Sequence, residues 1–264
     1  MLIKVIAIAL FFTLFCSAVA FMVGSLLSPE TAIFTGLIFF VISLLVSAAT
    51  YKLSAGIILR RYKAKPSEDE KLNNMVEGLA LDANMPVPKI YILPFDMPNS
   101  FAAGHEKNAA ICVTEGLLAM NKGEIEGVVS HGLWHIRNGD TMVQDFVSVM
   151  AHMLYCTIVL IPLAVLIVKI SLNPVREYTA DYYGSSFSKK PKDLASALRK
   201  MSEAARQKPL KGSPAFESIW VIDPFKREGI NLWFSSDPPT ARRAKRLDDM
   251  VHEGMPEPPV VTEV

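Results

Sequence analysis

The chain has 264 residues, of which 51% are hydrophobic and 20% are charged; this combination excludes an ordinary soluble protein and predicts membrane helices joined to one soluble domain of about 150 residues. The net charge of +1 gives no electrostatic basis for binding nucleic acid, so nucleic acid is not an expected partner. The chain has three cysteines, Cys16, Cys112 and Cys156, and none of them has CxxC spacing. The odd number and this spacing argue against a disulfide framework and against a cysteine-type zinc site.

Two uncharged runs at the start of the sequence predict a transmembrane helical hairpin over residues 1–61. Residues 5–27 can cross a hydrocarbon core of the usual thickness as a helix, and residues 31–49 form a second run of similar length. The residues Ser28-Pro29-Glu30 between the two runs predict a short turn.

The basic residues around this hairpin predict its orientation. Lys4 precedes the first run, and five basic residues follow the second (Lys52, Arg60, Arg61, Lys63 and Lys65). The positive-inside rule therefore places both ends, and the domain that follows, in the cytoplasm. A cleaved signal peptide is the alternative interpretation, because Ala18-Val19-Ala20 resembles a cleavage site.

The sequence after the hairpin predicts an α+β domain over residues 62–254 and a disordered, proline-rich tail over residues 255–264. Helical spacing begins at Glu70, and Lys89–Leu93 and Ala109–Thr114 are typical of short strands.

The low-charge segment between these strands could form another strand. Its free edge could bind an extended peptide by strand addition, or it could simply complete a small sheet packed on helices. The residues concerned are Asn99, Ser100, Phe101, Ala102, Ala103 and Gly104.

His131 and His135 lie four residues apart in a segment with helical spacing, so both imidazoles share one helix face. This is the geometry of a zinc site with two nitrogen ligands from one helix, although two histidines on a partly buried helix without metal give the same pattern. In the H-E-x-x-H motif of zincins the glutamate is the general base, and here its position is held by Gly132.

The apolar run over residues 143–170 is too short for two membrane spans. A single crossing would put His131 and everything after residue 170 on opposite sides of the membrane. The alternative is a helical hairpin, kinked near Pro162, that enters one leaflet or packs on the domain.

The segment after this run predicts a helix with Asn173 as its N-cap and Pro174 at its first position. Glu177 and Asp181 share one face of this helix, and a His₂Glu set is one form of zinc site. Asp181 could then accept a hydrogen bond from a ligand imidazole. A solvated carboxylate pair is the alternative.

Five ordered motifs together resemble the HtpX-like membrane metallopeptidases, which are relatives of the CaaX prenyl proteases. The motifs are the hairpin, residues 98–104, His131-x-x-x-His135 with Asn138-Gly139-Asp140, Arg176-Glu177-x-x-Ala180-Asp181, and Phe234-Ser235-Ser236-Asp237-Pro238-Pro239-Thr240-x-Arg242. The resemblance extends from residue 1 to about residue 250.

This resemblance implies a mainly helical, zincin-like fold with a small sheet, and one Zn²⁺ per chain held by His131, His135 and Glu177. It also implies a substrate strand that docks along Asn99–Gly104. The implied setting is the bacterial inner membrane, with unfolded or membrane-protein polypeptides as substrates in protein quality control.

Gly132 and Asp237 depart from the family, which has glutamate at the first position and usually histidine at the second. The interval from His135 to Glu177 is also shorter than in relatives with two spans there. General acid–base catalysis contributes about 10²–10⁴-fold to the rate, so little turnover is expected without the glutamate, whereas zinc binding should survive.

Asp237 could be a relocated base, or it could cap the turn before Pro238-Pro239.

Three functions follow as alternatives: a zinc endopeptidase, a zinc-binding pseudopeptidase or engineered inactive variant that still binds polypeptide, and a metal-free membrane scaffold. A basic helix face near the end of the chain is expected to be solvated, with contact to anionic lipid as the alternative (Arg242, Arg243, Lys245 and Arg246).

Overall fold

The computed structural model describes residues 1–156, 160–225 and 237–252. The predicted disordered tail and the motif residues Phe234, Ser235 and Ser236 lie outside these ranges. The structure confirms the predicted α+β class: helices dominate, and a single four-stranded sheet lies beside them in the described part of the chain.

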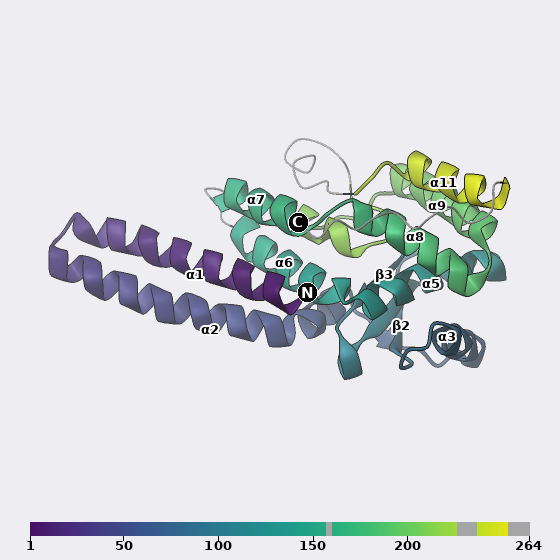
Figure 1. Ribbon diagram of the computed structural model, residues 1–264, viewed down its shortest axis with the longest axis horizontal. Coiled ribbons are helices and arrows are strands. Elements are labelled where there is room, and N and C mark those ends of the chain that lie inside the picture. Colours follow the sequence, from purple (N-terminus) through teal and green to yellow (C-terminus); the bar gives the residue numbers. More distant parts are fainter. Residues whose placement is uncertain (157–159, 226–236, 253–264) are drawn as a thin grey trace.

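The helices α1 (Leu2–Ser25) and α2 (Pro29–Arg61) form the predicted hairpin, which extends away from the rest of the molecule (Figure 1). Small residues let the two helices approach closely, and the hydroxyl of Ser17 donates to the carbonyl of Gly36 over 2.8 Å. Both helices are long and apolar enough to cross a membrane. Most of their large apolar side chains face outward, such as Phe34, which is 70% exposed.

The sheet has the strand order β1-β2-β4-β3. β2 (Lys89–Leu93) runs parallel to β4 (Ala110–Thr114), whereas β1 (Lys65–Pro66) and β3 (Ser100–Ala103) are antiparallel to their neighbours. The segment after Asn99 is therefore a strand, and it lies at the edge of the sheet.

Successive side chains of β4 point to opposite faces of the sheet, and all of them are buried, so both faces of the sheet are covered at this strand. Ile111 and Val113 face a core formed with α3 (Glu70–Asp82), α5 (Lys122–Asn138), α9 (Pro191–Gln207) and α11 (Thr240–His252). Cys112 faces a second core, in which Tyr62 and Trp220 pack around the strands. The three cysteines are free.

The third apolar run forms a second helical hairpin, α6 (Asp140–Tyr155) and α7 (Ile161–Ser171). Its apolar contacts with α1 involve residues from Val5 to Cys16, in the first two thirds of that helix, so it lies beside the part of the membrane hairpin nearest the domain (Figure 1). The described residues of the run thus form two helices that pack against each other rather than one continuous helix. The predicted break near Pro162 is confirmed: α6 ends at Tyr155 and α7 begins at Ile161, so Pro162 lies in the first turn of α7, where its missing N–H needs no helical partner.

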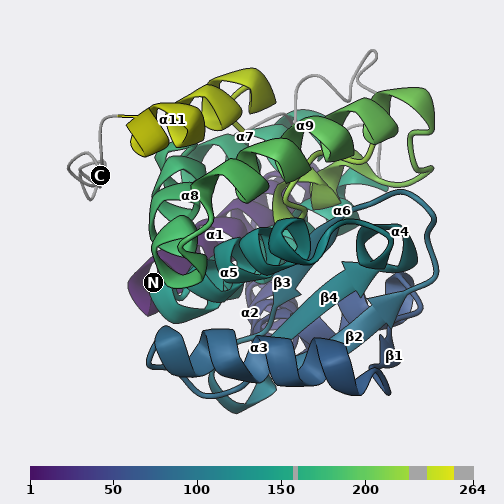
Figure 2. The ribbon, with the colours of Figure 1, turned by 90° about the vertical axis from the view of Figure 1, so that its right-hand side faces the viewer.

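α5 is the central helix of the domain. It packs against β3, α3, α8 (Val175–Ser188) and α9, with α4 (Glu115–Leu118) leading into it from β4. Figure 2 shows α5 lying across the sheet, with α8 and α9 stacked beyond it. The face of α5 that carries the two histidines is therefore enclosed on several sides.

Candidate metal centre

α5 places its two histidines on one buried face. The helix begins where the Glu124 carboxylate accepts the backbone N–H of Asn121 over 3.2 Å, and it ends at Gly139, whose φ of 76° is the left-handed conformation that glycine adopts without strain. His131 and His135 are 1% and 5% exposed, and their Nε2 atoms lie 3.1 Å apart.

Glu177 of α8 completes a triangle with these two nitrogens. Its carboxylate oxygens lie 3.5 Å from His131 Nε2 and 3.4 Å from His135 Nε2. Tetrahedral zinc with bonds of about 2.0–2.1 Å requires ligand atoms about 3.3–3.4 Å apart. The three side chains are a group able to hold a metal ion, and their spacing fits zinc.

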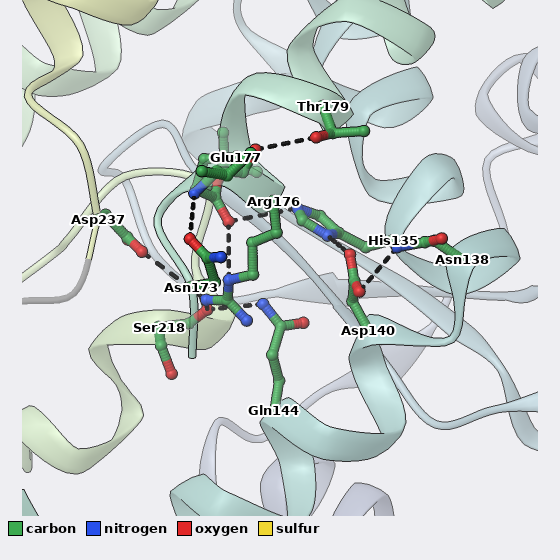
Figure 3. A network of polar contacts seen from close by, with 12 residues as sticks. His135, Asn138, Asp140, Gln144, Asn173, Arg176, Glu177, Thr179, Ser218 and Asp237 are labelled. Atoms are coloured by element: carbon green, nitrogen blue, oxygen red, sulfur yellow. Dashed lines mark hydrogen bonds and ion pairs between the residues drawn. The ribbon is translucent and has the colours of Figure 1, made fainter. Parts of the chain in front are cut away.

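A carboxylate orients each imidazole. Asp140, the first residue of α6, accepts from His135 Nδ1 over 2.8 Å, and Asn138 donates to its other oxygen (Figure 3). Asp181 lies 2.9 Å from His131 Nδ1. Because a carboxylate only accepts hydrogen bonds, each Nδ1 carries a proton, and Nε2 is the ring nitrogen that faces the triangle and can coordinate a metal. The role of Asp140 was not predicted, although the turn at Gly139 could have suggested it.

The electrostatics of this site are dominated by burial and by close opposite charges. Burial by itself would lower the pKa of His135, but the charges of Glu177 and Asp140 raise that pKa to about 9. Burial by itself would raise the pKa of Glu177, yet His135 and Arg243 hold that pKa well below its usual range. Glu177 is therefore an anion, as a zinc ligand must be.

Arg243 on α11 is a buried part of this site, which corrects the prediction of a solvated basic face for this residue; Arg242, Lys245 and Arg246 are exposed, as predicted. Its guanidinium donates through Nε and Nη2 to both oxygens of Asp181, each over 2.8 Å, and its Nη1 lies 3.2 Å from Glu177. The side chain is 1% exposed, whereas Arg242, the arginine assigned to the motif, is exposed. The rotation of α11 about its own axis buries Arg243 and exposes Arg242, and no local sequence pattern determines that rotation.

Asp237 contacts Arg176 next to the metal triangle. Arg176 is 3.5 Å from Glu177 and 3.7 Å from Asp237, so its guanidinium pairs with both carboxylates (Figure 3). Burial and the charge of Glu177 raise the pKa of Asp237 above its ordinary value. Asp237 is thus near the site, through Arg176, rather than among the groups that contact the histidines.

Gly132 lies beside the triangle in a cavity of about 10 Å³, which is about the size of one water molecule. A Cβ atom at this position would lie 2.9 Å from Ile111 Cδ1 and 3.8 Å from Ala102 Cβ. Ser218, Ile219, Trp220 and Val221 form one side of this cavity.

Residues 218–222 also occupy much of the strand edge that was predicted to bind substrate. The backbone N–H of Val221 donates to Ser100 over 3.0 Å, and the Asn99 side chain donates to Ile222 over 2.7 Å. At the far end of the strand, Gly104 donates to Asp145 and accepts from Thr141. All six predicted residues are buried, and of these only Ala102 lines the cavity.

The carbonyl of Ser218 is held next to the metal triangle. It accepts from Gln144 over 2.9 Å and from Arg176 over 3.1 Å (Figure 3). These two donors come from α6 and α8 and converge on one peptide oxygen. Neither residue was assigned a role from the sequence.

Gly184 sets the distance between α8 and α5. A Cβ atom there would lie 2.7 Å from the backbone of His131, so only glycine allows the close approach that brings Glu177 and Asp181 to the histidines. α8 begins at Val175, one residue later than predicted, although Asn173 still accepts the N–H of Val175 over 2.9 Å.

We therefore expect Gly184→Ala to reduce the free energy of unfolding by about 1–3 kcal/mol, because the added methyl group has only backbone to displace. The variant should also bind zinc more weakly, since α8 carries Glu177. Chemical denaturation and a chelator competition measure the two effects. Gly78→Ala on α3 is the matched control, because no atom lies within 4 Å of the added Cβ. Equal stability of the two variants would contradict this role of Gly184.

Comparison with known proteins identifies the family. Residues 66–251 match the sequence pattern of peptidase family M48. The chain is 34% identical to a protease HtpX homolog of Thermococcus sibiricus over 88% of this chain and 91% of that protein. It is 36% identical to the homolog of Pyrococcus furiosus over 82% and 87% of the two chains, and 31% identical to that of Salinibacter ruber over 81% and 87%.

Among solved structures, the crystal structure of S. mikatae Ste24p aligns with 80% of this chain and 57% of that chain, with a TM-score of 0.46 and 17% identity. The family match covers more than half of the chain and includes every residue of the metal triangle. The chain therefore belongs to peptidase family M48 and is an HtpX-like member of this family of membrane metalloproteases.

Proposed function

We propose that this chain binds one zinc ion through His131, His135 and Glu177 and acts as an HtpX-like membrane scaffold for polypeptides, with peptide cleavage impaired at Gly132. The observation that carries the proposal is the ligand triangle. Two imidazole Nε2 atoms and an anionic carboxylate converge within 3.1–3.5 Å, an arrangement that a cation, either a metal ion or a proton, stabilises.

When bound, zinc supplies a Lewis acid that polarises a peptide carbonyl and activates water. The residues of the chain hold the ion, orient both imidazoles and exclude bulk solvent. A proton released by the attacking water needs an acceptor, and Gly132 supplies none. Asp237 is the alternative acceptor, but among the described contacts it pairs with Arg176 and not with either histidine, which supports impaired catalysis more than a relocated base.

The pairing along the edge of β3 supports a further element of this proposal. Ser218–Val221 occupies that edge, so we propose that it moves aside when polypeptide binds and that docking then extends along Ala102 and its neighbours on the strand. The substrates we propose are unfolded or membrane-embedded polypeptides, because the site lies next to two helices able to cross a membrane. A role in membrane-protein quality control would follow from such substrates.

We also propose that residues 62–254 form the metallopeptidase domain and that it faces the cytoplasm, as in a bacterial inner membrane. The support is the charge pattern: Lys4 and the basic residues at the end of α2 flank the hairpin on the side of the domain.

Metal analysis of the detergent-purified chain tests the ligand assignment. We expect about one zinc per chain in the parent and almost none in His135→Ala, because two ligands hold zinc far more weakly than three. His105→Ala is the matched control, since His105 lies outside the triangle and should leave the zinc content unchanged. Zinc retained in His135→Ala, or absent from the parent, would refute the proposed site and favour a metal-free scaffold.

A further inference from the structure

The carbonyl oxygen of Ser218 is held by two buried donors that come from different helices. Gln144 of α6 donates to it over 2.9 Å, and Arg176 of α8 donates to it over 3.1 Å (Figure 3). Gln144 is 2% exposed, and the side chain of Arg176 is 10% exposed. A buried donor that loses its acceptor costs free energy, so these two groups favour any state in which a carbonyl oxygen lies between them.

Gln144 and Arg176, which we call the carbonyl-binding pair, lie next to the metal triangle. Gln144 and Ser218 line the same small cavity as the three proposed zinc ligands. Arg176 precedes Glu177 on α8, and its Nε atom lies 3.5 Å from the Glu177 carboxylate. The carbonyl that this pair holds is therefore beside the place where the proposed zinc ion would be bound.

The segment that carries Ser218 also pairs with the edge strand β3. Trp220 is extended, with φ of −84° and ψ of 147°, and it forms an antiparallel bridge with Phe101. The backbone N–H of Val221 donates to Ser100 over 3.0 Å. The segment thus combines strand pairing on β3 with a carbonyl held beside the metal triangle. Both are contacts of the main chain, which any extended polypeptide can make whatever its side chains are.

We propose that Gln144 and Arg176 form a binding site for a backbone carbonyl of the bound polypeptide, and that Ser218 fills this site as an internal substitute when no polypeptide is bound. The inference rests on the proposed function, because it assigns two residues to the polypeptide that the scaffold would bind. Arg176 gives the stronger of the two contacts, since its donor is charged. The ligand recognised is an extended main chain rather than a particular side chain.

The internal substitute and the polypeptide would compete for the same two donors. Loss of one donor therefore weakens the state with Ser218 in place and the state with polypeptide bound. The apparent dissociation constant is the intrinsic constant divided by the fraction of molecules able to bind, so the two effects cancel while most molecules hold Ser218 in place. If Gln144 only held Ser218, its loss would instead free the site and tighten polypeptide binding.

Val221→Pro separates these two cases, because it releases the segment without changing either donor. Proline has no N–H to donate to Ser100, and it favours the extended conformation that the preceding residue, Trp220, already has. Ile222→Pro is a second release variant, since it removes the N–H that donates to the Asn99 side chain over 3.4 Å. Faster hydrogen exchange of this segment, with unchanged exchange in α9, identifies release in a protein that is still folded.

The measurement is the fluorescence anisotropy of a short fluorescein-labelled peptide of alternating valine and threonine, titrated with the full chain in detergent. We expect each release variant to bind this peptide more tightly than the parent. Gln144→Met should leave the affinity of the parent within twofold, but it should weaken binding about fivefold when combined with Val221→Pro, as expected for one lost hydrogen bond. Gln207→Met makes the same change at an exposed position of α9 and should alter neither affinity.

Two results would overturn this inference alone. Tighter binding by Gln144→Met in the parent would show that Gln144 only holds Ser218, and an unchanged affinity in the Val221→Pro background would show that the peptide makes no use of this donor. Absence of peptide binding in the parent and in both release variants would instead refute polypeptide binding itself, and with it the proposed function. Arg176 stays unchanged throughout, because it also contacts Glu177 and Asp237.

Discussion

Gly132→Glu is expected to increase hydrolysis of a denatured membrane protein by about 10²–10⁴-fold over the parent chain, because it returns a general base to a site that otherwise retains its proposed ligands. Residue 132 lies one position from His131 and lines the same cavity as both histidines and Glu177. A carboxylate at this position would therefore reach water next to the ligand triangle.

The structure shows what this substitution must displace. The new Cβ would lie 2.9 Å from Ile111 Cδ1, which is the tip of a side chain rather than backbone. Combining Gly132→Glu with Ile111→Val removes that atom and should cost about 0.5–1.5 kcal/mol of stability. We expect this double variant to be at least as active as Gly132→Glu.

Gly132→Gln is the matched control, because glutamine has the shape of glutamate and cannot act as the base. Its rate should equal that of the parent, and Gly132→Glu combined with His135→Ala should be equally slow. Equal rates for the glutamine and glutamate variants would contradict the prediction. If the parent itself cleaves efficiently, another base exists, and Asp237→Ala should then abolish the activity.

Arg243→Ala is expected to reduce the free energy of unfolding by about 3–5 kcal/mol, because it leaves buried carboxylates without their cation. Arg243 binds both oxygens of Asp181 and lies 3.2 Å from Glu177, with its side chain almost fully buried. Removing it should destabilise the zinc-free protein more than the zinc-loaded protein, because a bound cation would still compensate Glu177. Denaturation with and without added chelator measures the difference.

Arg242→Ala is a close control for this prediction. Arg242 precedes Arg243 on the same helix and is exposed, so its loss should change stability by no more than about 0.5 kcal/mol. Arg243→Lys should recover only part of the stability, since an ammonium group cannot reproduce the two parallel bonds to Asp181. Similar unfolding curves for Arg242→Ala and Arg243→Ala would show that the buried guanidinium contributes little.

The sequence by itself determined the features that depend on local periodicity. Uncharged runs of sufficient length predicted the membrane hairpin, and alternating β-branched residues predicted β2 and β4. The four-residue spacing of His131 and His135 placed both rings on one face of α5, because a helix turns once in 3.6 residues. The same reasoning paired Glu177 with Asp181 on α8.

Only the tertiary structure decided which side chains meet across long stretches of sequence. Asp140 reaches His135 through the left-handed turn at Gly139, and Arg243 enters the site through the register of α11. Trp220 and its neighbours cover the edge of β3 because their backbone pairs with it. Residues 219–222 have the composition of a strand, but the sequence does not show which strand edge they meet.

The physical reason is that the approach of helices is set by packing rather than by local pattern. α8 meets α5 backbone to backbone because Gly184 has no Cβ, and a single methyl group would separate Glu177 from the two histidines. Residue types and their spacing therefore determined the chemistry that this chain can offer. The close contacts of α8, α11 and residues 218–222 around α5 decided where that chemistry is assembled and which side chains surround it.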